Sequence, residues 1–178
     1  MDYNDLIKKR RSIRKFQDKA VEKSKVDEII SAALLAPSGK RMFPCEFIVV
    51  DDKFILEKLS EAKTHGAKLI KGAPLAIVVA VDTNLYDVWV EDASVASTFI
   101  MLAAENCGLG CCWVQMHLRG TADGKMANEN LKEILNLPDG YDILSVQAIG
   151  YKAEEKPAYK SEELKHEKVH YNSINTKK

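Results

Sequence analysis

The sequence has no apolar stretch long enough to cross a bilayer, and its first residues lack the basic and then apolar segments of a signal peptide. Lys and Arg together number 26, as do Asp and Glu, so there is no excess of positive charge to neutralise a nucleic-acid backbone. We therefore expect a cytoplasmic protein that enters no membrane and binds no nucleic acid.

Several enzyme motifs are also absent. The sequence has no Gly-x-Ser-x-Gly elbow, its four histidines show no partner pattern, and its glycines do not follow Gly-x-Gly-x-x-Gly. Cys107, Cys111, Cys112 and His117 lie close together, but without Cys-x-x-Cys pairs, and a strand would send the adjacent thiols to opposite faces. We expect no metal site and interpret the four cysteines as reduced packing residues, although they could pair.

What is present is the ordinary mixture of a globular protein, with 178 residues, 46% of them hydrophobic. This length suits one domain, over residues 1–178. Periodicity predicts helices over 3–10 with Asp2 as cap, from a Ser24–Asp27 capping box to Pro37, after Asp52, over 92–106, and up to about 137–138. Strands are predicted over 46–50, 76–81 (buried on both faces), 111–116 and 142–150, which together give an α+β or mixed-sheet fold.

The helix over 92–106 is apolar nearly all round. Ala93, Ala96, Ile100, Ala103 and Cys107 form one stripe, and further apolar residues, Val95, Phe99 and Leu102, form a second. Such a helix must be central. By contrast, residues 151–178 are charged and poor in apolar residues, so this tail either stays mobile or lies across a partner subunit.

Three segments are candidate ligand sites. The turn of Arg10, Arg11, Ser12 and Arg14 offers guanidinium and hydroxyl donors to a phosphate, although it could equally be a solvated helix end. The segment Pro37-Ser38-Gly39-Lys40 is either a ligand-binding loop or a plain turn. The third segment, Gly108-Leu109-Gly110, is predicted to end one helix and to lead into the strand that contains Trp113.

Taken in order, these segments resemble the FMN-dependent nitroreductase family along nearly the whole chain, from Asp2 to about Tyr171. The resemblance is carried by the following stretches: Arg10 to Phe16, Ala36-Pro37-Ser38-Gly39 with Pro44 before residues 46–50, Ala73-Pro74, Ala103-Ala104, Gly108-Leu109-Gly110 with Trp113, and Ile149-Gly150-Tyr151. No single motif is decisive, but the ordered set is specific.

The resemblance implies a mixed, largely antiparallel sheet flanked by helices, in an entwined homodimer. The long central helix and a C-terminal arm, residues 151–178, would join the two subunits, and one FMN would lie in each of two interface sites. The small-residue stripe and the core-poor tail agree with this picture.

The resemblance also implies cofactor-binding roles. Arg10, Arg11 and Ser12 would hold the FMN phosphate and ribityl chain, with Arg14 nearby and Lys160 or Lys156 arriving from the tail. Pro37, Ser38, Gly39 and Lys40 match the segment that the partner subunit places beside the flavin. Lys68, with His65 one turn earlier, would lie near the pyrimidine edge, where a cation stabilises reduced flavin; otherwise Lys68 is an exposed helix lysine.

Residues Trp113, Val114, Gln115 and Met116 would run beside the isoalloxazine ring, with backbone N–H groups around Gln115 and Met116 donating to its N5 atom, the hydride acceptor. Otherwise Trp113 is simply a core residue. The sequence departs from the family at Arg41-Met42-Phe43-Pro44-Cys45, where relatives commonly have Asn-x-Gln-Pro-Trp, so the usual substrate range cannot be assumed.

We therefore expect an oxidoreductase that moves a hydride from NADH or NADPH through FMN to a nitroaromatic, a quinone or a similar conjugated acceptor. No side chain need act as acid or base, because the hydride chemistry belongs to the cofactor. One alternative is another flavin reaction on the same scaffold, such as reductive dehalogenation or flavin remodelling. Another is a non-catalytic flavin carrier or sensor.

Overall fold

The computed structural model describes residues 2–85 and 87–174, and its centre is a four-stranded sheet. The strands are β1 (Cys45–Val50), β2 (Leu75–Asp82), β3 (Gly110–Gln115) and β4 (Tyr141–Gly150), in the spatial order β1-β2-β4-β3. All three strand pairs are antiparallel, and a parallel bridge joins Ser12 to Cys111 of β3. The predicted α+β fold with a largely antiparallel sheet is confirmed.

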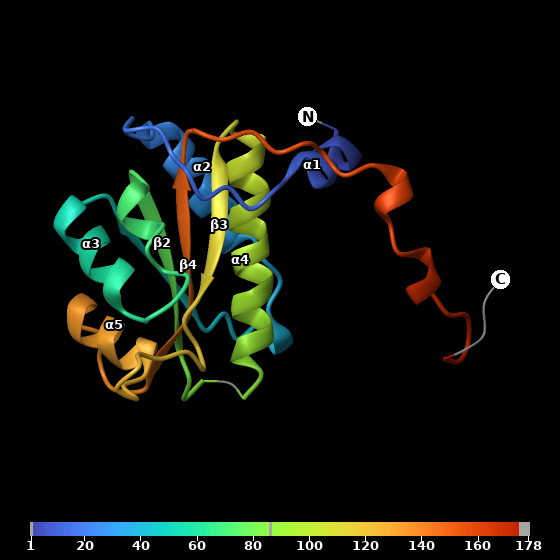
Figure 1. The fold of residues 1–178 in the computed structure, drawn as a ribbon. Coiled ribbons are helices and arrows are strands. Elements are labelled where there is room, and N and C mark those ends of the chain that lie inside the picture. Colours follow the sequence, from blue (N-terminus) through green and yellow to red (C-terminus); the bar gives the residue numbers. More distant parts are fainter. Residues whose placement is uncertain (1, 86, 175–178) are drawn as a thin grey trace.

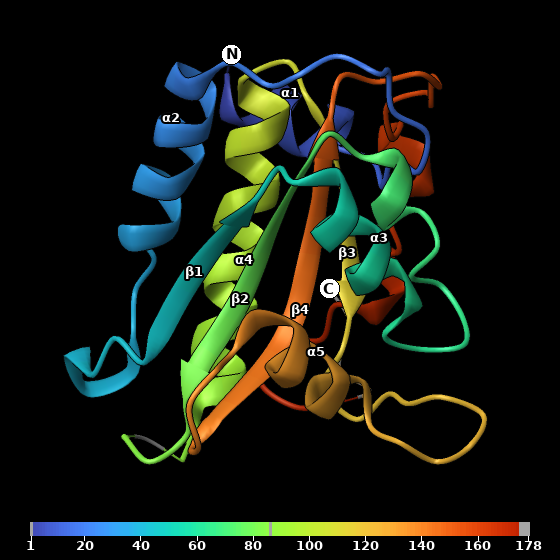
Figure 2. The ribbon, with the colours of Figure 1, turned by 90° about the vertical axis from the view of Figure 1, so that its left-hand side faces the viewer.

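Helices cover both faces of the sheet (Figures 1 and 2). The described helices are α1 (Tyr3–Lys9), α2 (Lys23–Leu34), α3 (Lys53–Glu61), α4 (Trp89–Asn106) and α5 (Ala127–Leu135), with short 3-10 turns η1 (Gly39–Arg41), η2 (Ile70–Gly72), η3 (Ser161–Glu163) and η4 (His166–Lys168). One core lies between the sheet and α3 and α5, and the other lies between the sheet and α2 and α4. Among the described helices, none is both long and apolar enough to span a bilayer.

The central strand β2 is buried on both faces, as its continuous apolar sequence predicted. Val78 and Ala80 belong to the α3–α5 core, whereas Ile77 and Val79 belong to the α2–α4 core, because successive side chains of a strand point to opposite faces. In the strand order of the sheet, β2 and β4 are the two middle strands, and β1 and β3 are the edge strands.

Helix starts were predicted well where an acid caps the helix. Asp2 accepts a hydrogen bond from Asn4, and Asp52 accepts two from the first turn of α3. The capping box at Ser24 is wrong: α2 begins one residue earlier, and Ser24 lies inside its first turn, where its side chain cannot cap. Helix α4 begins at Trp89, three residues before the predicted start.

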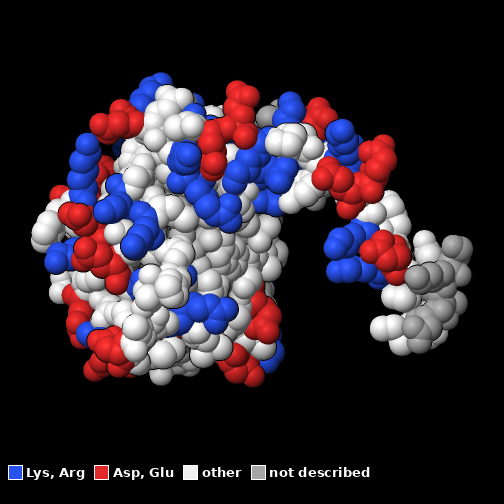
Figure 3. All heavy atoms as spheres, in the orientation of Figure 1, with Lys and Arg blue, Asp and Glu red and all other residues white. Residues whose placement is uncertain are grey.

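Helix α4 buries the predicted small-residue stripe and leaves the second apolar stripe partly exposed. Ala93, Ala96 and Ile100 are almost completely buried, whereas Val95 and Phe99 are only half-buried. Beyond β4, the chain leaves the body of the protein as an extended arm (Figures 1 and 3). Leu164 and Val169 of this arm are 52% and 48% exposed.

The base of the arm is fastened to the body. The segment over residues 12–17 lies between β3 and the start of the arm: Ile13 N–H donates to Cys111 O (3.0 Å), and Ala153 N–H donates to Lys15 O (3.0 Å). Lys152 also forms an ion pair with the almost buried Glu105 of α4, with N–O distances of 2.6 and 2.8 Å. The two ends of the chain therefore lie beside each other at one end of the sheet.

Candidate functional site

The basic turn, Arg10 to Arg14, lies against the first residues of β3. Gly110 permits this approach, because a Cβ atom on it would lie 2.8 Å from the Ile13 side chain, closer than real Cβ contacts come. Figure 3 shows Lys and Arg side chains gathered near this end of β3, with an uncharged surface beside them. The predicted cluster of guanidinium groups thus lies at one end of an edge strand.

The donors of the basic turn are only partly used within the chain. The guanidinium of Arg11 donates to Pro157 O and stacks on the ring of Tyr159, 4.3 Å from its centroid. Arg14 donates to Ser12 O at 3.4 Å. Each guanidinium carries five N–H groups, so donors are left for an anion.

The arm brings a further cation to the basic turn. The ammonium of Lys156 donates to Ser12 O and lies 3.5 Å from Glu154. Glu154 accepts a hydrogen bond from Arg14 N–H, and this bond, with Lys156, holds the pKa of its carboxyl below the usual value. Lys160, in contrast, lines a small pocket together with Ile7 and Lys8 of α1, so Lys156 is the tail lysine that reaches the basic turn.

Beyond the basic turn, β3 presents a free edge. Cys111 O accepts from Ile13 N–H, and Gln115 O accepts from the ammonium of Lys63 at 2.6 Å, so these two residues point their backbone groups away from β4. Because a strand alternates with a period of two residues, Trp113 faces the same edge. The N–H groups of Trp113 and Gln115 thus point outward along one line.

Two of the predicted ring-contacting residues point the other way. Met116 N–H donates to Leu144 O at 2.9 Å, so it cannot donate to a ligand, and the Met116 side chain is fully buried. Val114 pairs with Val146 of β4, and its side chain is 2% exposed. The prediction for backbone donation by Met116 is therefore wrong, and Trp113 and Gln115 are the residues on the edge.

The side chains of Trp113 and Gln115 are also connected. Trp113 Nε1 donates to Gln115 Oε1 at 2.8 Å, and Gln115 Nε2 donates to His117 O at 3.1 Å. Trp113 packs partly against the α2–α4 core, so its core role and its place at the edge are compatible.

Lys63, which the sequence patterns did not single out, supplies the cation at this edge. Burial, followed by the charge of Arg119, lowers the pKa of its half-buried ammonium from the usual 10.5. The predicted cation, Lys68, and its companion His65 are both exposed in the loop after α3, which ends at Glu61, so they do not lie one helical turn apart. No local sequence pattern could have indicated that Lys63 lies at this edge, because its partner Gln115 is distant in sequence.

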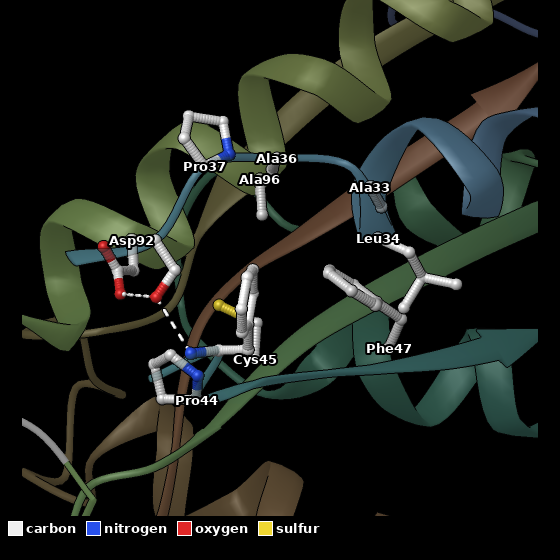
Figure 4. Close-up of a pocket in the computed structure, with 11 residues that line it drawn as sticks. Ala33, Leu34, Ala36, Pro37, Pro44, Cys45, Phe47, Asp92 and Ala96 are labelled. Atoms are coloured by element: carbon white, nitrogen blue, oxygen red, sulfur yellow. Dashed lines mark hydrogen bonds between the residues drawn. The ribbon is translucent and has the colours of Figure 1, made fainter. Parts of the chain in front are cut away.

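The Ser38 loop is tied to the start of α4. Ser38 Oγ donates to Asp92 Oδ2 at 2.7 Å, and Gly39 N–H donates to Asp92 Oδ1 at 2.9 Å. Lys40 has a left-handed backbone, with a φ of 51°, which is uncommon outside glycine. Figure 4 shows the small pocket beside this loop, lined by Pro37 and Cys45 among others.

Within one chain, the Ser38 loop and the basic turn do not meet. The loop contacts Asp92 in the first turn of α4, whereas the basic turn contacts β3, which follows the last turn of α4. A helix rises 1.5 Å per residue, so roughly 20 Å separates the two ends. Figure 2 shows the loop and the basic turn at opposite ends of the sheet.

The cysteines are free thiols with raised pKa values. Burial raises the pKa of Cys45 to about 12 and that of Cys107 to about 11, and it also raises the pKa of Cys111. Cys111 packs in the α2–α4 core, as predicted for one of two adjacent thiols on opposite strand faces. None of these three environments favours a thiolate nucleophile.

Comparisons with known proteins agree with this architecture. An FMN-dependent nitroreductase from Clostridium difficile R20291 has a solved structure that superposes with a TM-score of 0.95 at 47% identity, covering 96% of this chain and 99% of that one. A putative NADH dehydrogenase/NAD(P)H nitroreductase from Archaeoglobus fulgidus is 38% identical over 162 residues, which are 89% of this chain and 90% of the relative.

Two further relatives differ in the activity that their names state. FMN reductase (NAD(P)H) of Bacillus subtilis is 30% identical over 196 residues, covering 95% of this chain and 76% of the relative. A shorter stretch, 38% of this chain, is 32% identical to iodotyrosine deiodinase 1 of Sus scrofa, of which it covers 24%. The model of the Nitroreductase family matches residues 7–68 and 56–151. Because these matches span most of the sequence, the chain belongs to the nitroreductase family.

Proposed function

We propose that the protein is an FMN-dependent oxidoreductase that passes a hydride from NADH or NADPH to a nitroaromatic, a quinone or a similar conjugated acceptor. The observation that carries the proposal is the order of donors along β3: a cluster of cations at its start and outward N–H groups with a lysine at its end. Flavin mononucleotide has the matching order of groups, with an anionic phosphate at one end and a flat polar ring at the other.

Each part of the edge has a role in this proposal. Arg10, Arg11 and Ser12 hold the phosphate, and Lys156 adds charge from the arm. The N–H of Gln115 hydrogen-bonds the ring, and Lys63 keeps a positive charge beside it. When bound, FMN supplies the hydride chemistry, and the protein supplies orientation and electrostatics.

We further propose that the protein is a homodimer and that residues 1–178 form one FMN-binding unit whose arm, residues 151–178, crosses to the partner. Three observations support this: the half-exposed outer stripe of α4, the exposed apolar side chains of the arm, and the distance between the Ser38 loop and the basic turn. A second copy can bring its Ser38 loop, Pro37 to Lys40, to the β3 edge that this loop cannot reach in its own chain. We also propose a cytoplasmic location.

The proposed activity is tested by mixing the purified yellow protein with NADH or NADPH under anaerobic conditions. We expect the yellow colour to bleach and to return when a quinone or a nitrofuran is added, because one site serves donor and acceptor in turn. A flavin carrier stays yellow, which would exclude an enzyme. Sedimentation velocity should give twice the mass of one chain, and a colourless preparation that takes up no FMN would overturn the cofactor assignment.

A second experiment asks which lysine lies beside the ring. Lys63→Met should lower the midpoint potential of bound FMN by roughly 20–60 mV, because losing about 1–3 kcal/mol of charge stabilisation shifts a two-electron couple by that amount. Lys68→Met is the matched control, since Lys68 is exposed in a loop, and should leave the potential unchanged. Spectroelectrochemical titration measures both. A larger shift in the Lys68 variant would restore the assignment made from the sequence.

The dehalogenation alternative rests on the partial match to iodotyrosine deiodinase. It predicts that the reduced protein removes iodide from a halogenated phenol, which iodide analysis of the same anaerobic mixture detects.

A further inference from the structure

His117 and Asp142 form a pair just beyond the end of β3. His117 Nδ1 lies 3.3 Å from Asp142 Oδ2, and the two side chains are only 21% and 16% exposed. The rings of Trp89 and His117 pack in a T-shaped arrangement, with the ring centroids 4.8 Å apart and the planes at 83°. The imidazole is therefore held by a carboxylate and by an indole.

Asp142 is itself fixed in place. Its Oδ1 atom accepts hydrogen bonds from Asn128 Nδ2 at 2.7 Å and from Ile143 N–H at 2.6 Å, so Oδ2 is left to face the histidine. Because two hydrogen bonds hold Oδ1, the Asp142 carboxylate keeps one orientation at the start of β4. The carboxylate therefore acts as a rigid support for one side of the His117 ring.

This support lies on the Nδ1 side of the His117 ring. Nδ1 is buried and forms no hydrogen bond with any described residue; the carboxylate of Asp142 is the charged group that faces it, 3.3 Å away. A proton on Nδ1 is favoured next to a carboxylate, as in other carboxylate–histidine pairs. In the neutral ring Nε2 is then the nitrogen without a proton.

The pair lies beside the proposed cofactor edge. His117 follows Gln115 by two residues, and its backbone oxygen accepts the hydrogen bond of the Gln115 side chain. Arg119 follows His117 by two residues, and its charge acts on Lys63, whose ammonium donates to Gln115 O; Asp142 is the carboxylate that faces the imidazole.

We propose that His117, oriented by Asp142, donates a proton from Nε2 to an oxygen of the acceptor, which we take to be a quinone or a similar conjugated carbonyl. This inference rests on the proposed function. NAD(P)H gives up a hydride, hence two electrons, and leaves as NAD(P)⁺. The quinone gains this hydride, and its remaining anionic oxygen forms an O–H bond with the proton that breaks away from His117. Solvent then returns a proton to Nε2.

The test separates the two halves of the reaction by stopped-flow spectroscopy. In His117→Gln, bleaching by NAD(P)H should stay within twofold of the wild-type rate. Reoxidation by menadione should slow about a hundredfold, the usual contribution of a general acid, and should lose its pH dependence. Reoxidation by ferricyanide, which takes electrons without protons, should be unchanged. An exposed histidine, His166, provides the matched control as His166→Gln.

The orientation of the ring has a readout that needs no turnover. In ¹⁵N-imidazole NMR, neutral His117 should carry its proton on Nδ1, and Asp142→Asn should move it towards Nε2. Menadione reoxidation within twofold of wild type in His117→Gln would overturn the inference, as would an Nε2–H tautomer in the wild type. Equal slowing with ferricyanide would show a purely structural role. If NAD(P)H fails to bleach the wild type, the proposed function itself fails.

Discussion

Replacing Arg10 and Arg11 together with alanine is expected to weaken FMN binding by roughly a hundredfold to ten-thousandfold. Each charge-assisted hydrogen bond contributes about 1.5–3 kcal/mol, and the two losses together reach about 3–6 kcal/mol. The structure supports a large loss, because the two residues adjoin the start of β3 and Arg11, which donates from one nitrogen to Pro157 O, has further N–H groups. Fluorescence titration of apoprotein with FMN measures the affinity.

Two controls isolate the phosphate contact. Lys23→Ala with Lys53→Ala removes the same charge from exposed ion pairs and should leave FMN affinity unchanged. Tyr159→Ala removes the ring on which Arg11 stacks, so it measures how much of the loss comes through the arm. An affinity for FMN that survives in the double arginine variant would disprove the phosphate assignment.

Replacing Lys152 with methionine is expected to lower the free energy of unfolding by about 3 kcal/mol and the melting temperature by roughly 6–12 °C. The change leaves the carboxylate of Glu105, which is only 6% exposed, without its counter-charge. Replacing the other partner, in Glu105→Gln, should lower the free energy of unfolding by only about 1 kcal/mol. The Lys152 side chain is 30% exposed, so its ammonium can turn to water. Thermal unfolding at equal FMN content measures both.

The double variant Glu105→Gln with Lys152→Met should recover most of the stability lost in Lys152→Met, since the buried charge is gone. The exposed pair of Lys125 and Glu133 offers the control: Glu133→Gln should change stability by less than about 0.5 kcal/mol. If Lys152→Met destabilised the protein no more than Glu133→Gln, the ion pair would not be what fastens the arm to α4.

The regular elements could be predicted from the sequence because their signals are local. The continuous apolar run of β2 and the three-and-four spacing of α4 each depend on neighbours a few residues apart. The basic turn was predictable for the same reason, since its donors are adjacent in sequence. The Ser24 capping box was a wrong prediction because α2 already begins at Lys23, after an N-cap residue, Glu22, whose side chain forms no capping hydrogen bond.

The details of the site depend instead on how distant segments meet. Lys63 reaches β3 from the loop after α3, and the sequence has no local pattern that marks this contact. Met116 was assigned an outward N–H, but the N–H groups of both Met116 and His117 bond to Leu144 O, an irregularity that only the strand pairing reveals. The carboxylate behind His117 likewise comes from the start of another strand.

Gly110 has no charge, no side-chain donor and no titratable group, yet it sets how closely the basic turn approaches the sheet. A single methyl group there would push Ile13 outward and carry the neighbouring hydroxyl and guanidinium groups with it. A survey restricted to side chains that carry donors or charges would therefore overlook a position that controls where those side chains lie.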